Sequence, residues 1–362
     1  MGPLTIRAGP AALARIRNHG LQAQDVAIIP AAAGGPKGLI LQALDQFLFG
    51  QWLPAAPRVR TLIGSSIGAW RMAAACSGDP AAAFQRLGDL YCAQHYSRKP
   101  SAQEVSAVIR NLLQDFIGGQ ETDIVSHPLQ RLQIITARGL GLLETAHSDW
   151  ARKAGFGAAA LANLAGRTRL ARHLQRVIIG NAGASEQWLS TPFDAFSTHF
   201  SALTADNLGA ALLASGTLPL VMQPVSAIPH APRGNYWDGG LIDYHLALPY
   251  GRLAGRDDGG LVLYPHFGPH IVPGWLDKGM PWRRRRQGCD WLKNVILLAP
   301  SKAFLQGLPR KKLPDRKDFQ HFGMDHALRG RQWQSAIRQG AELRDAFAAF
   351  VAHPDPRLVQ PL

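Results

Sequence analysis

The segment GSSIG at residues 64–68 places Ser66 at the centre of a G-x-S-x-G pattern. Glycines on both sides of a serine allow a tight turn from a strand into a helix, which leaves the serine exposed for nucleophilic attack. The dipole of the following helix would stabilise the charge that develops on the serine oxygen. A purely structural turn fits the same pattern. Ser65 lies off the centre, and we expect it to serve packing or a backbone hydrogen bond.

A second segment, AAGGPKG at residues 32–38, can bind an anion through its backbone. Consecutive glycines expose N–H groups, which can hold a phosphate or form an oxyanion hole for a tetrahedral intermediate. The segment is not a P-loop, because Leu39 follows Gly38 and the spacing from glycine to lysine is wrong, and the G-x-G-x-x-G fingerprint is absent. Close helix packing is the alternative reason for the glycines. Lys37 would orient the loop, attract an anionic head group, or simply be solvated.

A third segment, NYWDGGLIDYH at residues 235–245, offers a carboxylate as a base. Asp238 follows a short aromatic, strand-like approach and precedes two glycines, so it can lie at a sheet edge and accept a proton from a serine. An ordinary Asp-Gly turn is the alternative. Asp243 and His245 are close enough in sequence to compete for the role of base. Because Ser66 and Asp238 are far apart in the chain, only the fold can bring them together.

The elements around these segments predict an α/β fold with a mostly parallel central sheet flanked by helices, because strand-like and helix-like patterns alternate. Residues 79–130 and 139–175 are expected to be mostly helices and polar loops that cover a sheet edge or form a cap, and 280–318 is the most loop-like stretch and a candidate mobile insertion. The expected strands are 26–31, 58–64, 132–137, 176–180, 261–267 and 294–300, and the expected helices are 37–49, 67–75 and one closing amphipathic helix at 327–352.

The sequence resembles the patatin-like phospholipase family, because three motifs of that family occur in the same order: GGPKG (34–38), GSSIG (64–68) and DGG (238–240). ALLASGTLPLVMQPV at 211–225 is similar to the A-S-x-x-x-P segment of that family and supplies Ser215 and Pro219. The resemblance covers about residues 26–250. It implies a three-layer architecture in one domain over 1–362, with 251–362 adding strands, a basic loop and a C-terminal helix. The loop of that family often begins with an aspartate and three glycines. In this chain Ala32 stands at the position of the aspartate and Ala33 at that of the first glycine, and Pro36 lies within the loop and has no N–H.

The resemblance also implies a Ser–Asp dyad without histidine. Ser66 would be the nucleophile, and Asp238 the base that activates first the serine and later water. The oxyanion hole would be built by the loop of Gly34, Gly35, Lys37 and Gly38, through the amides of its glycines.

The composition of the chain indicates which partners and which cellular compartment to expect. The 39 Lys and Arg residues against 25 acidic residues give a formal net charge of +14, a surface that attracts anionic membranes, nucleic acid or acidic ligands. We expect no nucleic-acid role, because no recognition helix, RNA-binding signature or zinc finger is present. The 3 cysteines lack disulfide or zinc spacing, and neither a signal peptide nor a membrane span is predicted. A cytoplasmic protein, with peripheral membrane contact at most, fits best.

Two further groups of residues have alternative readings. Trp282, the run RRRR at 283–286 and Trp291 are either a solvated basic loop or an interfacial anchor for anionic head groups. His266 and His270 are four residues apart, but Gly268 and Pro269 prevent a shared helix face, so we predict no metal and no cofactor.

The leading hypothesis is a serine hydrolase that cleaves acyl esters of phospholipids or lysophospholipids through an acyl-enzyme. One alternative is a conventional α/β-hydrolase whose triad histidine would be His321, His326 or His353. The other alternative is a non-catalytic lipid-binding protein with the same fold.

Overall fold

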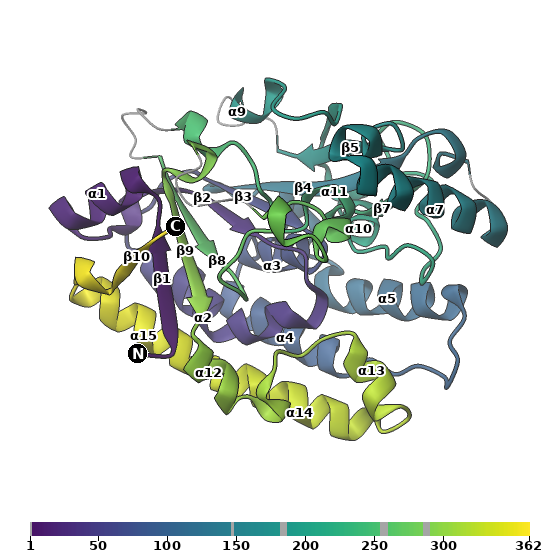
Figure 1. Cartoon of the computed structure of the whole chain (residues 1–362). Helices are drawn as coiled ribbons and strands as arrows, with labels where there is room; N and C mark the ends of the chain where they lie inside the picture. The colour runs from purple at the N-terminus through teal and green to yellow at the C-terminus, as the bar shows by residue number, and fades with distance from the viewer. Residues whose placement is uncertain (1, 146–147, 182–186, 254–259, 285–289) are drawn as a thin grey trace.

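The computed structural model describes residues 2–145, 148–181, 187–253, 260–284 and 290–362. Within these residues, ten strands form one sheet in the order β10-β1-β9-β8-β2-β3-β4-β5-β6, and β7 pairs with β4 beside this path (Figure 1). The strands are β1 Leu4–Ala8, β2 Val26–Ala31, β3 Arg60–Ser65, β4 Gln130–Gly139, β5 Leu174–Gly180, β6 Thr198–Ala202, β7 Tyr236–Asp238, β8 Leu261–Pro265, β9 Val295–Pro300 and β10 Val359–Pro361.

The centre of the sheet is parallel, which confirms the predicted fold class. Strands β9, β8, β2, β3 and β4 pair in parallel, whereas β1 with β9, β4 with β5 and β4 with β7 are antiparallel. Every residue of β3, β8 and β9 is buried, as expected for apolar strands that are covered on both faces.

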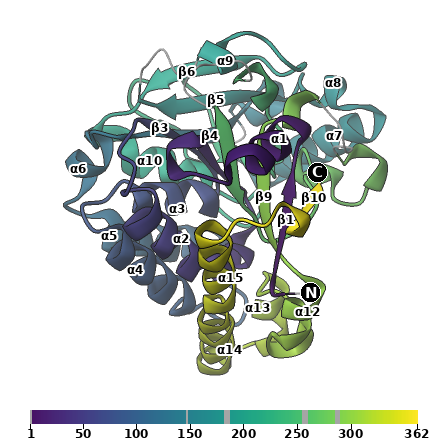
Figure 2. The same cartoon turned by 90° about the vertical axis from the view of Figure 1, so that its left-hand side faces the viewer.

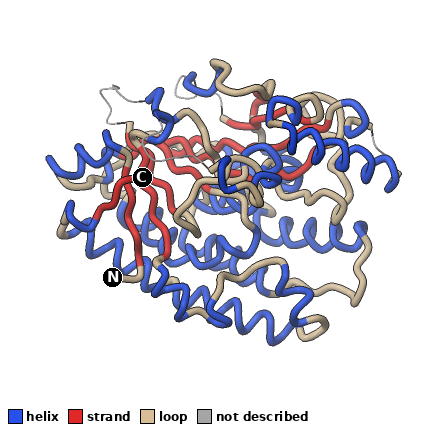
Figure 3. The backbone as a smooth tube through the Cα atoms, viewed as in Figure 1, coloured by secondary structure: helices blue, strands red, loops and turns tan. Residues whose placement is uncertain are grey.

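Helices cover both faces of this sheet and complete the three layers (Figure 3). The larger core cluster joins the sheet to α2, α3, α4 and α10, and a smaller cluster joins β4 and β5 to α7, α8 and α11. The α-helices are α1 Pro10–His19, α2 Gln42–Phe47, α3 Ile67–Ala75, α4 Pro80–Cys92, α5 Ala102–Ile117, α6 Glu121–Val125, α7 Asp149–Ala165, α8 Arg167–Leu170, α9 Gln187–Ser190, α10 Ala205–Ser215, α11 Gly240–Asp243, α12 Lys302–Gly307, α13 Lys317–Phe322, α14 His326–Gln339 and α15 Ala341–Ala352.

The six predicted strands correspond to β2, β3, β4, β5, β8 and β9, with ends that shift by two residues or fewer. The prediction omitted β1, β6 and β10. Strand β6 has largely unburied side chains, and β10 is three residues long and includes a proline, so neither carries a strong apolar pattern. Both lie at the edges of the sheet, where such sequences are tolerated.

Three predicted segments differ in the structure. The single helix over 327–352 is wrong: α14 ends and α15 begins around Gly340, where a side chain would come 2.3 Å from the Ile40 carbonyl oxygen. The helix over 37–49 is a 3₁₀ turn (η2, Gly35–Leu41), then α2, then a π turn (η3, Leu48–Trp52). The stretch 280–318, predicted to be the most loop-like, contains α12 in addition to the predicted strand β9.

The first and last strands lie side by side at one edge of the sheet, where β1 pairs in parallel with β10 (Figure 2). Strands β8 and β9 come from the C-terminal third of the chain, yet they lie between β1 and β2. The segments that follow β8 and β9 are therefore carried to the same region as the loop after β2. No helix of the described residues combines the length and the apolar character needed to cross a bilayer.

Candidate active site

Ser66 stands on a sharp turn between β3 and α3. Its φ of 57° and ψ of −132° lie in a region that serine rarely adopts, which is typical of a strained nucleophile elbow. Both flanking glycines are required by close backbone contacts. A Cβ at Gly64 would come 2.5 Å from the Ala69 backbone, and one at Gly68 would come 1.9 Å from the Ala31 carbonyl oxygen. The sequence therefore forces β3 and α3 into close contact with β2.

Asp238 lies directly beside this turn. The Ser66 Oγ donates a hydrogen bond to Asp238 Oδ2 at 2.7 Å, although the two residues are 172 positions apart. Strand β4 brings Ser66 and Asp238 together, because its Ile135 pairs with Ser65 of β3 and its Thr136 pairs with Asp238 of β7. The second carboxylate oxygen of Asp238 accepts the Gly240 amide at 2.7 Å, which fixes the orientation of the carboxylate.

The C-terminal end of α10 ties the two segments together. Ser215 Oγ accepts the Ser66 amide at 2.9 Å and donates to the Ile135 carbonyl at 2.7 Å. The Asp238 amide donates to the Thr217 carbonyl at 2.8 Å. Ser215, which the sequence offered only as part of a motif, is thus a positioning residue for the turn. Pro219 is buried just after this end of α10.

Burial raises the pKa of Asp238 above its ordinary value, although the Arg316 guanidinium, the Ser66 hydroxyl, the Gly240 amide and Lys278 each act in the opposite direction. Arg316 Nη2 lies 3.8 Å from Asp238 Oδ2. A carboxylate with a raised pKa is a stronger base than an ordinary aspartate. The arrangement can therefore take a proton from a hydroxyl that donates to it.

The glycine-rich loop after β2 lies close to this pair. Gly34 lines a cavity together with Asp238, and Gly35 has a φ of 57°, which favours glycine. The first N–H groups of a helix lack intrahelical acceptors, and η2 begins at Gly35, so the amides of Gly34 and Gly35 precede the hydrogen bonds within this turn. Pro36 has no N–H. A Cβ placed on Gly38 would lie 3.5 Å from the Arg71 side chain and 3.6 Å from that of Ile67, so this glycine packs against α3.

Lys37 is half-buried in the wall of the same cavity. Its ammonium group lies 5.4 Å from the centre of the Phe267 ring, and burial lowers its pKa. It therefore points toward the cavity and is not a freely solvated side chain.

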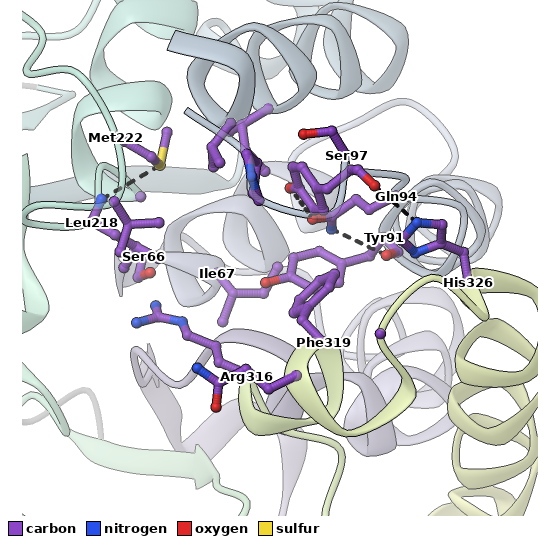
Figure 4. A pocket seen from close by; sticks show the side chains of 18 of the residues that line it. Ser66, Ile67, Tyr91, Gln94, Ser97, Leu218, Met222, Arg316, Phe319 and His326 are labelled. Carbon is purple, nitrogen blue, oxygen red and sulfur yellow. Dashed lines mark hydrogen bonds between the residues drawn. The ribbon is translucent and has the colours of Figure 1, made fainter. Parts of the chain in front are cut away.

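An apolar cavity of about 800 Å³ opens beside Ser66 (Figure 4). Ser66 and Arg316 lie at one end, and Ser97 and His326 at the other. Residues 91–109, within the stretch predicted to be helices and polar loops, form part of its wall. Val221 and Met324 also line the cavity, and they are 47% and 56% exposed, so its entrance is apolar on the outside.

A second cavity of about 260 Å³, with several charged side chains in its wall, adjoins Asp238. Arg316 lines both cavities and lies between them. Arg316 and Lys278 are not predicted as site residues from the sequence, because neither belongs to a motif. A basic D-R-K step at 315–317, inside a stretch predicted to be a loop, was the only local signal.

Asp243, His245 and Ser65 are not brought into this arrangement. Asp243 accepts two hydrogen bonds from the buried Arg176 guanidinium, at 2.6 and 3.0 Å. The His245 Nδ1 accepts the Val272 amide at 3.1 Å. The Ser65 hydroxyl is buried and has no hydrogen-bond partner among the described residues, so its role is packing and the expected backbone bond is absent.

The histidines proposed for a triad lie elsewhere. His326 lines the far end of the apolar cavity, where its Nε2 lies 3.0 Å from the Tyr96 carbonyl. His321 and His353 are exposed on the C-terminal helices. Within the described residues, the partner of the Ser66 hydroxyl is a carboxylate and not an imidazole.

The predicted basic cluster is only partly described, because Arg285 and Arg286 lie outside the described residues. Trp282 is 71% exposed. Arg283 is not a solvated side chain, since it donates to Asp277 at 2.8 Å and to the Asn163 carbonyl at 2.7 Å. Trp291 packs edge-on against Phe193. Only part of this cluster is therefore available to a lipid surface.

Residues 32–248 match the model of the protein family described as Patatin-like phospholipase. This segment includes the glycine-rich loop, the turn at Ser66 and Asp238, and it ends before Lys278 and Arg316. Comparison with curated proteins found no match.

Proposed function

We propose that this chain, which belongs to the patatin-like phospholipase family, hydrolyses acyl esters of phospholipids or lysophospholipids with Ser66 as nucleophile and Asp238 as base. Family membership indicates a lipid acyl hydrolase, and the dyad is our assignment. The observation that carries it is the 2.7 Å hydrogen bond from Ser66 Oγ to Asp238 Oδ2 on a strained turn. The adjoining apolar cavity has the size and lining that an acyl chain requires.

The proposed reaction has two halves. Ser66 Oγ attacks the ester carbonyl while its proton passes to Asp238 Oδ2, and the amides of Gly34 and Gly35 stabilise the oxyanion. The tetrahedral intermediate collapses, and the alcohol leaves with the proton from Asp238, which leaves an acyl-enzyme. Water then gives a proton to Asp238 and attacks the acyl carbonyl. The second intermediate releases the fatty acid and returns the proton to Ser66.

The test is hydrolysis by wild type and variants of p-nitrophenyl butyrate and a lysophospholipid. We expect turnover by wild type and a loss of at least about a thousandfold in kcat for Ser66→Ala and Asp238→Asn. His321→Ala and His353→Ala are matched controls that should keep wild-type activity. Activity that survives Asp238→Asn but disappears in one histidine variant would support the triad alternative. Lipid binding without turnover by wild type would support the non-catalytic one.

A further inference from the structure

The second cavity, beside Asp238, has an excess of positive charge in its wall that the acyl transfer reaction does not need. Four cationic side chains, Lys37, Lys278, Arg316 and Lys317, line it together with two carboxylates, Asp238 and Asp315. Three of these cations lie beyond the segment that matches the family model. They reach the site because the connections after β8 and β9 end on the same side as the loop after β2.

Among the described residues, three of the cations, Lys37, Lys278 and Lys317, have no carboxylate partner. Asp315 accepts Lys312 at 3.0 Å, and Asp238 lies 3.8 Å from Arg316. Neither Lys37 nor Lys278 takes part in an ion pair among the described residues. Both ammonium groups lie instead near aromatic rings, with Lys278 Nζ 4.2 Å from the centre of the Tyr244 ring and Lys37 Nζ 5.4 Å from that of Phe267. The rings hold the two charges in place without neutralising them.

We propose that this cavity binds a phosphoryl group attached to the alcohol part of the substrate, so that the preferred ester is an acylglycerol phosphate with a small anionic head group. The inference rests on the proposed hydrolase function of Ser66 and Asp238. The apolar cavity takes the acyl chain, the ester lies at Ser66, and the phosphoryl group contacts Lys37, Lys278 and Arg316.

The dimensions and charge of the cavity limit the head group. A volume of about 260 Å³ is small for a second long acyl chain, and the four cationic side chains in its wall suit a phosphorylated glycerol better. The same cations would repel the quaternary ammonium of a choline head group, whereas charge-assisted hydrogen bonds favour a phosphate monoester. Arg316 contributes at the boundary, since its Nε would lie 3.3 Å from a Cβ placed on Gly35 of the glycine-rich loop.

The ionisation of Lys278 fits a site for an anion. Burial of the ammonium group, together with the nearby charges of Lys37 and Arg316, lowers the pKa of Lys278 to about 7, although Asp238 and Asp315 act in the opposite direction. A bound phosphoryl group restores the pKa of Lys278. Binding at pH 8 should therefore take up a proton from solution, and affinity for the phosphorylated ligand should fall as the pH rises through 7 to 8.

Binding to the Ser66→Ala variant tests the site without turnover. Calorimetry would compare octanoylglycerol phosphate with octanoylglycerol, glycerol 3-phosphate and inorganic phosphate, all below the micellar concentration. We expect the phosphorylated lipid to bind at least about tenfold more tightly than octanoylglycerol. Lys278→Ala and Lys37→Ala, each made in the Ser66→Ala background, should remove most of this preference. Lys302→Ala, which removes an exposed charge on α12 outside the cavity, should keep it.

Three results would overturn the inference: equal affinity for the two lipids, a preference that persists in both lysine variants, or inorganic phosphate that binds as tightly as the phosphorylated lipid. The last result would indicate a site for free phosphate and not for a lipid head group. Hydrolysis of p-nitrophenyl butyrate by wild type is measured in parallel. Its absence contradicts the proposed hydrolase function, while the binding data still decide the phosphoryl site.

Discussion

At the scale of single residues, the proposed chemistry depends on how strongly the Asp238 carboxylate attracts a proton. Burial raises its pKa, and Arg316 is the largest of the influences that lower it. A dyad without histidine needs this balance, because a fully neutral carboxyl group cannot accept the serine proton and an ordinary carboxylate is a weak base.

This balance predicts the acid limb of the pH profile. Only the deprotonated form of Asp238 is active, so kcat/KM for p-nitrophenyl butyrate should fall as the pH falls through its raised pKa, at a higher pH than for an ordinary aspartate. Arg316→Gln removes a nearby positive charge, which raises the pKa of Asp238 further and should move the acid limb to higher pH. Arg338→Gln, an exposed arginine on α14, is the control and should leave the limb in place. An acid limb unmoved by Arg316→Gln would contradict the electrostatic account.

At the scale of elements, the turn at Ser66 depends on the close contact of α3 with β2. A side chain at Gly68 would overlap the Ala31 carbonyl, so the contact cannot be kept if Gly68 is replaced. The whole of α3 is buried, which leaves no space for the helix to move away from the sheet.

Gly68→Ala should therefore lower the free energy of unfolding by more than about 2 kcal/mol and abolish esterase activity. Gly209→Ala is the matched control, since Gly209 is also helical, in α10, and a Cβ there meets nothing within 4 Å. That substitution should raise stability by about 0.5–1 kcal/mol, the helix preference for alanine. Urea unfolding of the two variants measures both effects, and a Gly68→Ala variant as stable as wild type would refute the packing argument.

The sequence predicted the parts of the site that are local. The turn at Ser66, the glycine-rich loop and Asp238 each carry their chemistry within a few residues, and the strands beside them are apolar runs. Arg316 and Lys278 were missed because their place depends on β8 and β9 lying between β1 and β2, a contact of distant segments. The break between α14 and α15 has the same origin, because it occurs where Gly340 packs against the Ile40 carbonyl, a residue far away in the sequence.

At the scale of the whole molecule, the C-terminal third is expected to belong to one folding unit with the rest. Strand β8 pairs with β2, and the side chains of β2 are almost all buried. Without β8, β9 and β10, the apolar edge of β2 would face solvent, and β1 would lose both of its neighbours.

A chain truncated to residues 1–250 should therefore lack cooperative thermal unfolding and should aggregate. A chain of residues 1–352 is the control, because it loses only the short edge strand β10 and should fold with reduced stability. Near-ultraviolet circular dichroism during heating distinguishes the two. Cooperative unfolding of the 1–250 chain would show that the first 250 residues fold alone, against the prediction of a single domain.

The central claim is that Ser66 is an activated nucleophile. The most direct measurement is the intact mass of wild type and Ser66→Ala after treatment with a fluorophosphonate, which forms a covalent bond to an activated serine and releases fluoride. The account predicts one adduct on wild type, located at Ser66, and none on the variant. No adduct on wild type, or an adduct that persists in Ser66→Ala, would contradict it.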